Sequence, residues 1–157
     1  MSDMPPRLTL MLEIRAHVAE PIELGEIVGG RRRIVPITGG TFEGRGGLAI
    51  RGRVRPGGAD WQLIQHDGLT EADARYVLET DAGQTIAVSN RGVRHAPADV
   101  MQRLLAGEPV DPSLVYFKST PRFETSAPEL QMLVRSVFVG VGERYPHEVV
   151  LRFWKVG

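Results

Sequence analysis

The sequence contains no cysteine. The chain therefore has no disulfide framework, no thiolate nucleophile and no metal site built from thiolates. Because disulfides are rare in reducing compartments, a cysteine-free chain fits such a compartment. We expect a cytoplasmic protein that needs no covalent cross-link to fold.

The chain also lacks an excess of charge of either sign. Lys and Arg number 19 together, and Asp and Glu also number 19. A protein that recruits nucleic acid or an anionic membrane by its overall field needs a basic excess. We expect neither as a partner, and we expect the ligand to be a small molecule.

Long apolar runs are absent as well. No segment approaches the roughly 20 apolar residues that a transmembrane helix needs. The first ten residues, MSDMPPRLTL, lack the cationic region and long apolar run of a secretory signal. These observations add to the expectation of a cytoplasmic protein.

Motifs for metals, cofactors and nucleophiles are missing too. The four histidines show no paired ligand spacing, and no Gly-x-Ser-x-Gly segment marks a nucleophile. The glycine pairs at 29–30, 39–40 and 57–58 do not open a helix, so they form turns and no dinucleotide loop. We expect no metal and no cofactor.

Alternating apolar and polar residues dominate what is present. From Arg7 to His17 every second residue is apolar, which is the pattern of a half-buried antiparallel strand. Further strand-like segments follow, separated by turns rich in glycine and proline, at residues 31–37, 48–55, 61–65, 73–79, 84–91, 115–118, 122–125, 130–141 and 149–156. Their number and spacing predict a single all-β domain, either a sandwich or a barrel.

One segment has helical spacing. Apolar residues at positions 100, 101, 104 and 105 fall on one stripe, Pro97 suits the first turn, and Gly107 can end the helix. The stripe predicts a short helix that covers an open end of the sheet structure.

Five segments of the chain closely resemble the domain of unknown function 3237 family of small bacterial and fungal proteins. They are residues 36–47 (PITGGTFEGRGG), 51–68 (RGRVRPGGADWQLIQHDG), 74–83 (ARYVLETDAG), 115–133 (VYFKSTPRFETSAPELQML) and 137–144 (VFVGVGER). The resemblance spans Leu8 to Val156. Family members are similar in fold to antiparallel β-barrels, so the resemblance implies a barrel. Alternation and turn spacing predict about nine strands and one short helix in a single domain over residues 1–157. The resemblance implies no activity and no catalytic residue.

Polar residues that suit a binding site are concentrated between Arg51 and Gly83 and recur in later strands. Buried charges need partners, so residues of this kind in a barrel interior indicate either ion pairs or a ligand. Trp61 offers a flat wall for a ring, and Asp60 beside it offers an acceptor or a base. The alternative is an outer face covered by salt bridges.

We predict that Asp60, Trp61, Arg75, Tyr116, Arg122 and Glu124 line one cavity. Candidate catalytic groups are Asp60, Glu124 and Tyr116, and candidate ligand-binding groups are Trp61, Arg75, Glu79, Arg91 and Arg122. Two functions fit these residues. One is a cofactor-free lyase, isomerase or cyclase that moves protons on a small oxygenated or aromatic metabolite, and the other is a binding or carrier module without turnover.

The apolar segment Leu130 to Val141 also bears on assembly. A strand with this composition at a sheet edge is often covered by self-association. We therefore expect a homo-oligomer.

Overall fold

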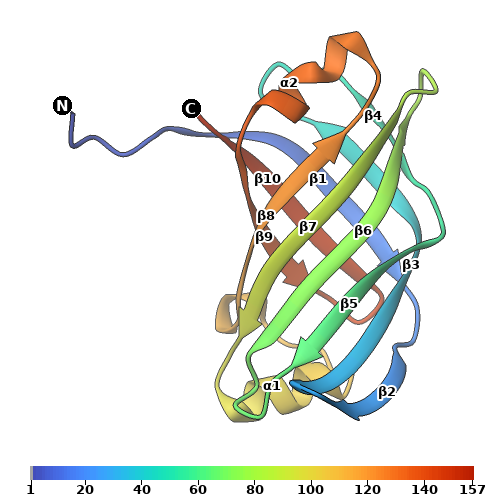
Figure 1. Ribbon diagram of the computed structural model, residues 1–157, viewed down its shortest axis with the longest axis vertical. Coiled ribbons are helices and arrows are strands. Elements are labelled where there is room, and N and C mark those ends of the chain that lie inside the picture. The colour runs from blue at the N-terminus through green and yellow to red at the C-terminus, as the bar shows by residue number, and fades with distance from the viewer. Residues whose placement is uncertain (1) are drawn as a thin grey trace.

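Residues 2–157, which the computed structural model describes, form an antiparallel β-barrel (Figure 1). Eight strands close the barrel and two more extend it. The strands are β1 Leu8–Val18, β2 Ile22–Ile27, β3 Gly30–Gly44, β4 Arg51–Val54, β5 Gly58–Ile64, β6 Thr70–Thr80, β7 Thr85–His95, β8 Tyr116–Glu124, β9 Phe138–Arg144 and β10 Glu148–Val156. The sequence prediction of an all-β barrel is confirmed.

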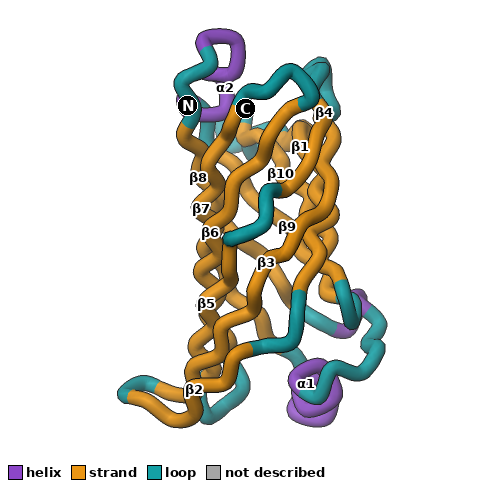
Figure 2. Tube along the Cα trace, turned by 90° about the vertical axis from the view of Figure 1, so that its right-hand side faces the viewer, coloured by secondary structure: helices purple, strands orange, loops and turns teal. Residues whose placement is uncertain are grey.

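Two short strands, β4 and β5, complete the wall of the barrel. Neighbouring strands pair around the wall in the order β1, β10, β9, β8, β7 and β6. Both β4 and β5 then bridge β6 to β3, and β3 pairs with β1. Strand β2 pairs with β3 outside the closed ring and extends the sheet near α1 (Figure 2).

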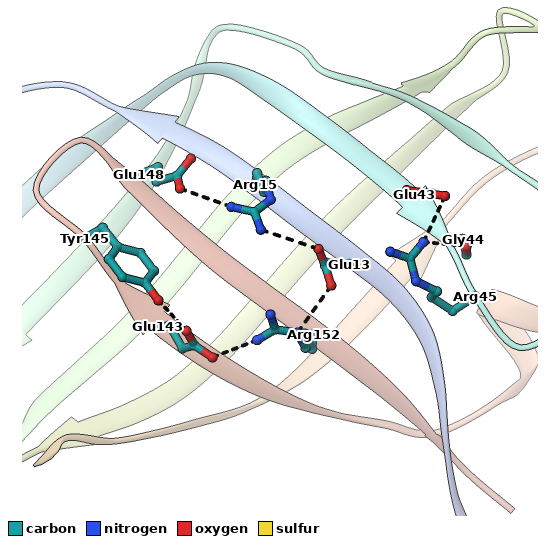
Figure 3. A network of polar contacts seen from close by, with 9 residues as sticks. All are labelled: Glu13, Arg15, Glu43, Gly44, Arg45, Glu143, Tyr145, Glu148 and Arg152. Carbon is teal, nitrogen blue, oxygen red and sulfur yellow. Dashed lines mark hydrogen bonds and ion pairs between the residues drawn. The ribbon is translucent and has the colours of Figure 1, made fainter. Parts of the chain in front are cut away.

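The period of two decides which side chains enter the barrel. In β1, Leu12, Ile14 and Ala16 are buried, whereas Glu13 and Arg15 between them remain accessible. The outward charges pair with one another across β1, β9 and β10 (Figure 3). Arg152 contacts Glu13 at 3.3 Å and Glu143 at 2.7 Å.

The two ends of the barrel are closed by different helices (Figure 1). Helix α2, Gln131–Arg135, follows the 3-10 turn Pro128–Leu130, and Leu130 and Leu133 join the main core. That core fills the adjacent half of the barrel with large side chains, among them Phe42, Leu78, Phe123, Phe138 and Phe153. This half therefore has the dense packing of an ordinary protein interior.

Helix α1, Ala98–Leu105, lies at the opposite end. Val100, Met101 and Leu104 pack with Val110 in a second, smaller cluster, which the 3-10 turn Pro112–Leu114 follows. The helix predicted from the apolar stripe is confirmed, and so is its location at a barrel end.

The prediction of one strand over Leu130 to Val141 is wrong. This segment holds the end of the 3-10 turn, helix α2 and the start of β9, which begins at Phe138. Leu130 and Leu133 are three residues apart, so they lie on one side of a helical turn and both enter the barrel end. Because most residues of this segment are apolar, the helical spacing of Leu130 and Leu133 does not stand out in the sequence.

Candidate functional site

The half of the barrel next to α1 is hollow. It contains a cavity of about 620 Å³. Small inward residues leave this space: Ala72 and Ala74 of β6 face Gly92 and Asn90 of β7. Nearer to α2 the same two strands carry Leu78 and Ile86 inward, which fill the barrel. The change from small to large inner residues therefore divides the barrel into a hollow half and a packed half.

Polar side chains from six strands line the cavity. They are Arg33 of β3, Asp60 and Gln62 of β5, Tyr76 of β6, Asn90 and Arg94 of β7, Ser119 of β8 and Arg144 of β9. Each occupies an inward position of its strand, as shown by pairs such as Arg33 with Gln62 and Asp60 with Ala74. Glu20, Glu23 and His147 also line the cavity, and the rest of the lining is mostly apolar, so the cavity has the composition of a small-molecule site.

Asp60 is the carboxylate inside this cavity. Gln62 Nε2 donates to Asp60 Oδ2 at 2.9 Å, and the backbone N–H of Asp73 donates to Oδ1 at 3.0 Å. Burial raises the pKa of Asp60, although these hydrogen bonds and the charge of Arg94 act in the opposite direction. A carboxyl group with a raised pKa is suited to exchange protons near neutral pH.

Three neutral polar groups in the cavity have no partner within the described residues. They are the hydroxyl of Tyr76, Oδ1 of Asn90 and Oγ of Ser119. An unsatisfied buried polar group costs about 1–3 kcal/mol. Burial and the charge of Asp60 raise the pKa of Tyr76, so its hydroxyl keeps its proton and can donate a hydrogen bond to a ligand.

Arg94 is the most deeply buried cation of the site, with a residue exposure of 5%. Its guanidinium lies 5.8 Å from the centre of the Phe117 ring, and its Nε has no hydrogen-bond partner among the described residues. Burial lowers the pKa of Arg94 to about 10, and Asp60 opposes that shift. Arg94 therefore remains charged at neutral pH.

Of the sequence-predicted site residues, only Asp60 lines this cavity. Trp61, Tyr116 and Arg91 instead line a groove of about 1020 Å³ on the outer wall. Trp61 and Tyr116 are 49% and 47% exposed, and Tyr116 stacks on His95 with ring centres 4.9 Å apart. The prediction that these residues share one cavity with Asp60 is wrong.

The other predicted residues also face outward. Arg75, Arg122 and Glu124 are exposed. Glu79 forms ion pairs with Arg53 at 3.1 Å and Arg55 at 2.8 Å, which is the outer salt-bridge face considered as the alternative. The reason is strand parity, because each of these residues alternates with buried neighbours, as in the pattern of β8.

Comparison with known proteins identifies the family. A family model described as "Protein of unknown function (DUF3237)" matches residues 6–156. The chain belongs to the DUF3237 family. A UPF0311 protein of Rhodopseudomonas palustris strain TIE-1 is 44% identical over 138 residues, which cover 88% of each chain.

Solved structures share the barrel of this DUF3237 protein. A conserved protein of unknown function from Rhodopseudomonas palustris has a TM-score of 0.91 and 39% identity, with 98% of this chain and 99% of that chain covered. A protein of Acinetobacter baumannii described as β-barrel-like has a TM-score of 0.84 and 39% identity, with 99% of each chain covered. A more distant structure, an enzyme from Penicillium herquei, has a TM-score of 0.72 and 19% identity, and covers 100% of this chain and 98% of its own. At that identity the likeness extends to the fold alone.

Sequence reasoning missed most of the cavity residues of the DUF3237 protein. The missed residues are Arg33, Gln62, Asn90, Arg94, Ser119 and Arg144. Their signal is a polar residue in register with apolar ones, because Asn90, for example, shares a face with Ile86 and Val88. The alternation therefore shows which residues share a face of each strand. The sequence prediction, however, placed the face with more charges in the barrel interior.

Metal clusters and membrane-spanning helices can be assessed for the described residues alone. Among residues 2–157 no three His, Asp or Glu side chains are placed to hold one metal ion. Within the same range no helix combines the length and apolarity needed to cross a membrane. The absence of a metal and of a cofactor remains a prediction.

Proposed function

We propose that the DUF3237 protein is a cofactor-free enzyme that moves protons on a small oxygenated or aromatic metabolite bound in the barrel cavity. The observation that carries the proposal is Asp60, a carboxyl group with a raised pKa on the wall of a cavity that also contains unsatisfied polar groups. Perturbed acids in concave sites mark acid/base chemistry more often than chance. A lyase, isomerase or cyclase would use such a group.

The chemistry begins with a proton next to a carbonyl group of the ligand. Asp60 takes this proton, and the electron pair of the broken C–H bond moves to the carbonyl oxygen. The Tyr76 hydroxyl and the Arg94 guanidinium are the donors that can stabilise the resulting enolate, because both stay protonated at neutral pH. Asp60 then returns the proton to another atom of the enolate system, which gives an isomerised product.

Deuterium exchange tests this proposal without knowledge of the natural substrate. We would incubate the protein in D2O with 2-hydroxyacetophenone and with acetylacetone, and follow deuterium incorporation by mass spectrometry. The wild type should accelerate exchange over buffer, and Asp60→Asn should reduce the rate by about 100-fold or more, as expected on loss of a general base.

Glu71→Gln is the matched control. Glu71 is on the same strand as Asp73, but its side chain is exposed on the outer wall and is not among the charges that shift the pKa of Asp60. It should leave exchange unchanged. Full exchange activity in Asp60→Asn would rule out Asp60 as the base.

A binding or carrier module is the second candidate. It is favoured by the two hydrogen bonds that already satisfy both oxygens of Asp60, from Gln62 and from the Asp73 backbone. A structural carboxylate would have the same partners. Ligand binding without any exchange would support this candidate.

The outer groove is the surface that fits self-association, which we also propose. It combines exposed Trp61 and Tyr116 with charges of both signs, such as Lys118 and Glu71. A two-fold interface needs this self-complementarity, because each patch contacts its own copy. The cytoplasm remains the proposed compartment on the grounds of the absent cysteine.

A further inference from the structure

Three arginines line the end of the cavity next to α1. They are Arg33 of β3, Arg94 of β7 and Arg144 of β9. Burial lowers the pKa of each, and the charge of Arg33 adds to the lowering at Arg94 and Arg144. Three mutually repelling cations in a part-buried space need an anion to offset their desolvation.

Arg94 has the weakest set of protein partners. Within the described residues it forms no ion pair shorter than 4.0 Å and no hydrogen bond, and Phe117 contacts its guanidinium by cation–π geometry alone. A structural arginine at this depth ordinarily has a carboxylate in direct contact. All five N–H donors of Arg94 are therefore available to a ligand.

Arg33 and Arg144 each use one nitrogen to hold the chain around α1. Arg33 NH1 donates to the carbonyl of Leu105 at 3.2 Å, and Arg144 NH1 donates to the carbonyl of Glu108 at 3.2 Å. Nε of Arg33 lies 3.3 Å from Glu23, outside hydrogen-bond geometry, and has no other partner. Both arginines thus fix the helix and retain free donors.

The carboxylates near the three arginines do not neutralise their combined positive charge. Asp60 is the one inside, where it accepts hydrogen bonds from Gln62 and from the Asp73 backbone, and within the described residues it forms no ion pair shorter than 4.0 Å with the three arginines. Glu23 at the mouth is bound by Arg31 at 2.7 Å as well as by Arg33. Glu20 and His147 also lie at the mouth, but Glu20 is exposed, so solvent screens its charge.

We infer that the ligand of this cavity is an organic carboxylate, whose anionic group binds at the α1 end between Arg94, Arg33 and Arg144. The inference rests on the proposed function of the cavity and names its substrate class. Guanidinium groups bind carboxylates by paired, charge-assisted hydrogen bonds. An inorganic anion would leave the apolar part of the wall unused.

The rest of the cavity defines the other end of this ligand. The apolar wall, which includes Val35, Ile37 and Leu151, suits a hydrocarbon or aromatic body. Beyond it, the Tyr76 hydroxyl and Asn90 Oδ1 lack partners. The ligand is therefore a carboxylic acid with a hydroxyl or carbonyl group at its far end.

Binding of matched probes tests the inference. We would measure the affinity of 4-hydroxybenzoate, of its neutral analogue 4-hydroxybenzamide and of 4-hydroxyphenyl phosphate by calorimetry and by the shift in melting temperature. The carboxylate should bind about tenfold or more tightly than the amide, and tighter binding of the phosphate would contradict the assignment of a carboxylate ligand. Arg94→Gln should remove this preference.

Arg91→Gln is the matched control, because Arg91 is on the same strand but its side chain is 78% exposed on the outer wall. It should bind 4-hydroxybenzoate like the wild type. If Arg94→Gln does not fold, Arg144→Gln at the cavity mouth provides the same comparison with a less buried side chain.

Three further results would overturn the inference: equal affinity for the amide and the carboxylate, unchanged carboxylate affinity in Arg94→Gln and Arg144→Gln, or failure of all three probes to bind. Equal binding of amide and carboxylate leaves the proton-transfer proposal intact, since deuterium exchange tests that separately. Carboxylate binding without exchange would reject the enzyme proposal and retain the ligand class.

Discussion

Asp60 and Arg94 lie in the same cavity and stabilise each other's charge, yet burial outweighs this attraction at both groups. The pKa of Asp60 is raised and that of Arg94 is lowered to about 10. No direct ion pair shorter than 4.0 Å joins them within the described residues. Burial of the two groups without a direct contact therefore costs stability.

The first prediction concerns pH and Asp60. Because its pKa is raised by folding, the folded chain binds this proton more tightly than the unfolded chain does. The contribution of Asp60 to stability is therefore fully present below its ordinary pKa of 3.8 and is lost as pH rises through the folded pKa. Asp60→Asn should be more stable than the wild type at pH 8, with a difference that shrinks toward pH 4, measured by urea unfolding. A difference that grows toward pH 4 would contradict the raised pKa.

The second prediction fills the cavity. Ala74 lines it, so Ala74→Leu should occupy part of the space without displacing packed side chains. We expect the free energy of unfolding to change by less than about 1 kcal/mol, with at least about a tenfold loss of 4-hydroxybenzoate affinity. Arg75→Leu, one residue further and exposed, should leave affinity unchanged. Unaltered binding by Ala74→Leu would place the binding site elsewhere.

The third prediction concerns the packed end. Leu133 of α2 is 1% exposed and joins the main core, so Leu133→Ala should destabilise the protein by about 2–5 kcal/mol. The neighbouring Val134 is 44% exposed, and Val134→Ala should change stability by less than about 0.5 kcal/mol. Equal effects of the two variants in thermal unfolding would mean that α2 does not close the barrel.

The fourth prediction concerns the ion-pair network in Figure 3. Hydrogen bonds from Tyr145 and Arg152 lower the pKa of Glu143, so its contribution is present above its ordinary pKa of 4.5 and is lost as pH falls through the folded value. These side chains are partly accessible to solvent, so Glu143→Gln should cost less than about 1 kcal/mol at low salt. The cost should decrease further in 1 M salt, and a cost that is independent of salt would argue against an electrostatic origin.

The fifth prediction concerns assembly. Trp61→Glu places a charge in the outer groove and should weaken self-association by about tenfold or more in sedimentation experiments. Arg122→Glu, on the outer wall but outside the groove, is the control. A wild-type protein that sediments as a monomer at high micromolar concentration would reject the proposed interface.

Sequence patterns predicted the barrel well because its main signals are local. The alternation of Leu8 to Ala16 and the helical stripe of α1 each depend on a single period. The 3-10 turn that begins at Pro128 and the helix α2 after it were not predicted from the sequence. Leu130 and Leu133 lie in a short apolar run that fits both the period of a strand and the period of a helix. The length of this run did not distinguish a strand from a helix.

The candidate site was predicted less well, for a different physical reason. Alternation shows that Trp61 and Asp60 face opposite sides, but adjacent polar residues in a strand do not reveal which of them enters the barrel. Outward charges such as Glu79 were available to pair with Arg53 and Arg55 across strands. Only strand pairing shows that these partners meet outside, which leaves Asp60 with Gln62 inside.

The division of the barrel into a packed half and a hollow half has a consequence for how this family diverges. The same strands supply both halves, but the main core of the barrel lies in the packed half beside helix α2. Substitutions at inner positions of the hollow half, such as Ala72 and Asp60, therefore reshape the cavity without changing that core. New ligands can arise in such a barrel by exchange of single inward side chains, while the outline of the protein stays the same.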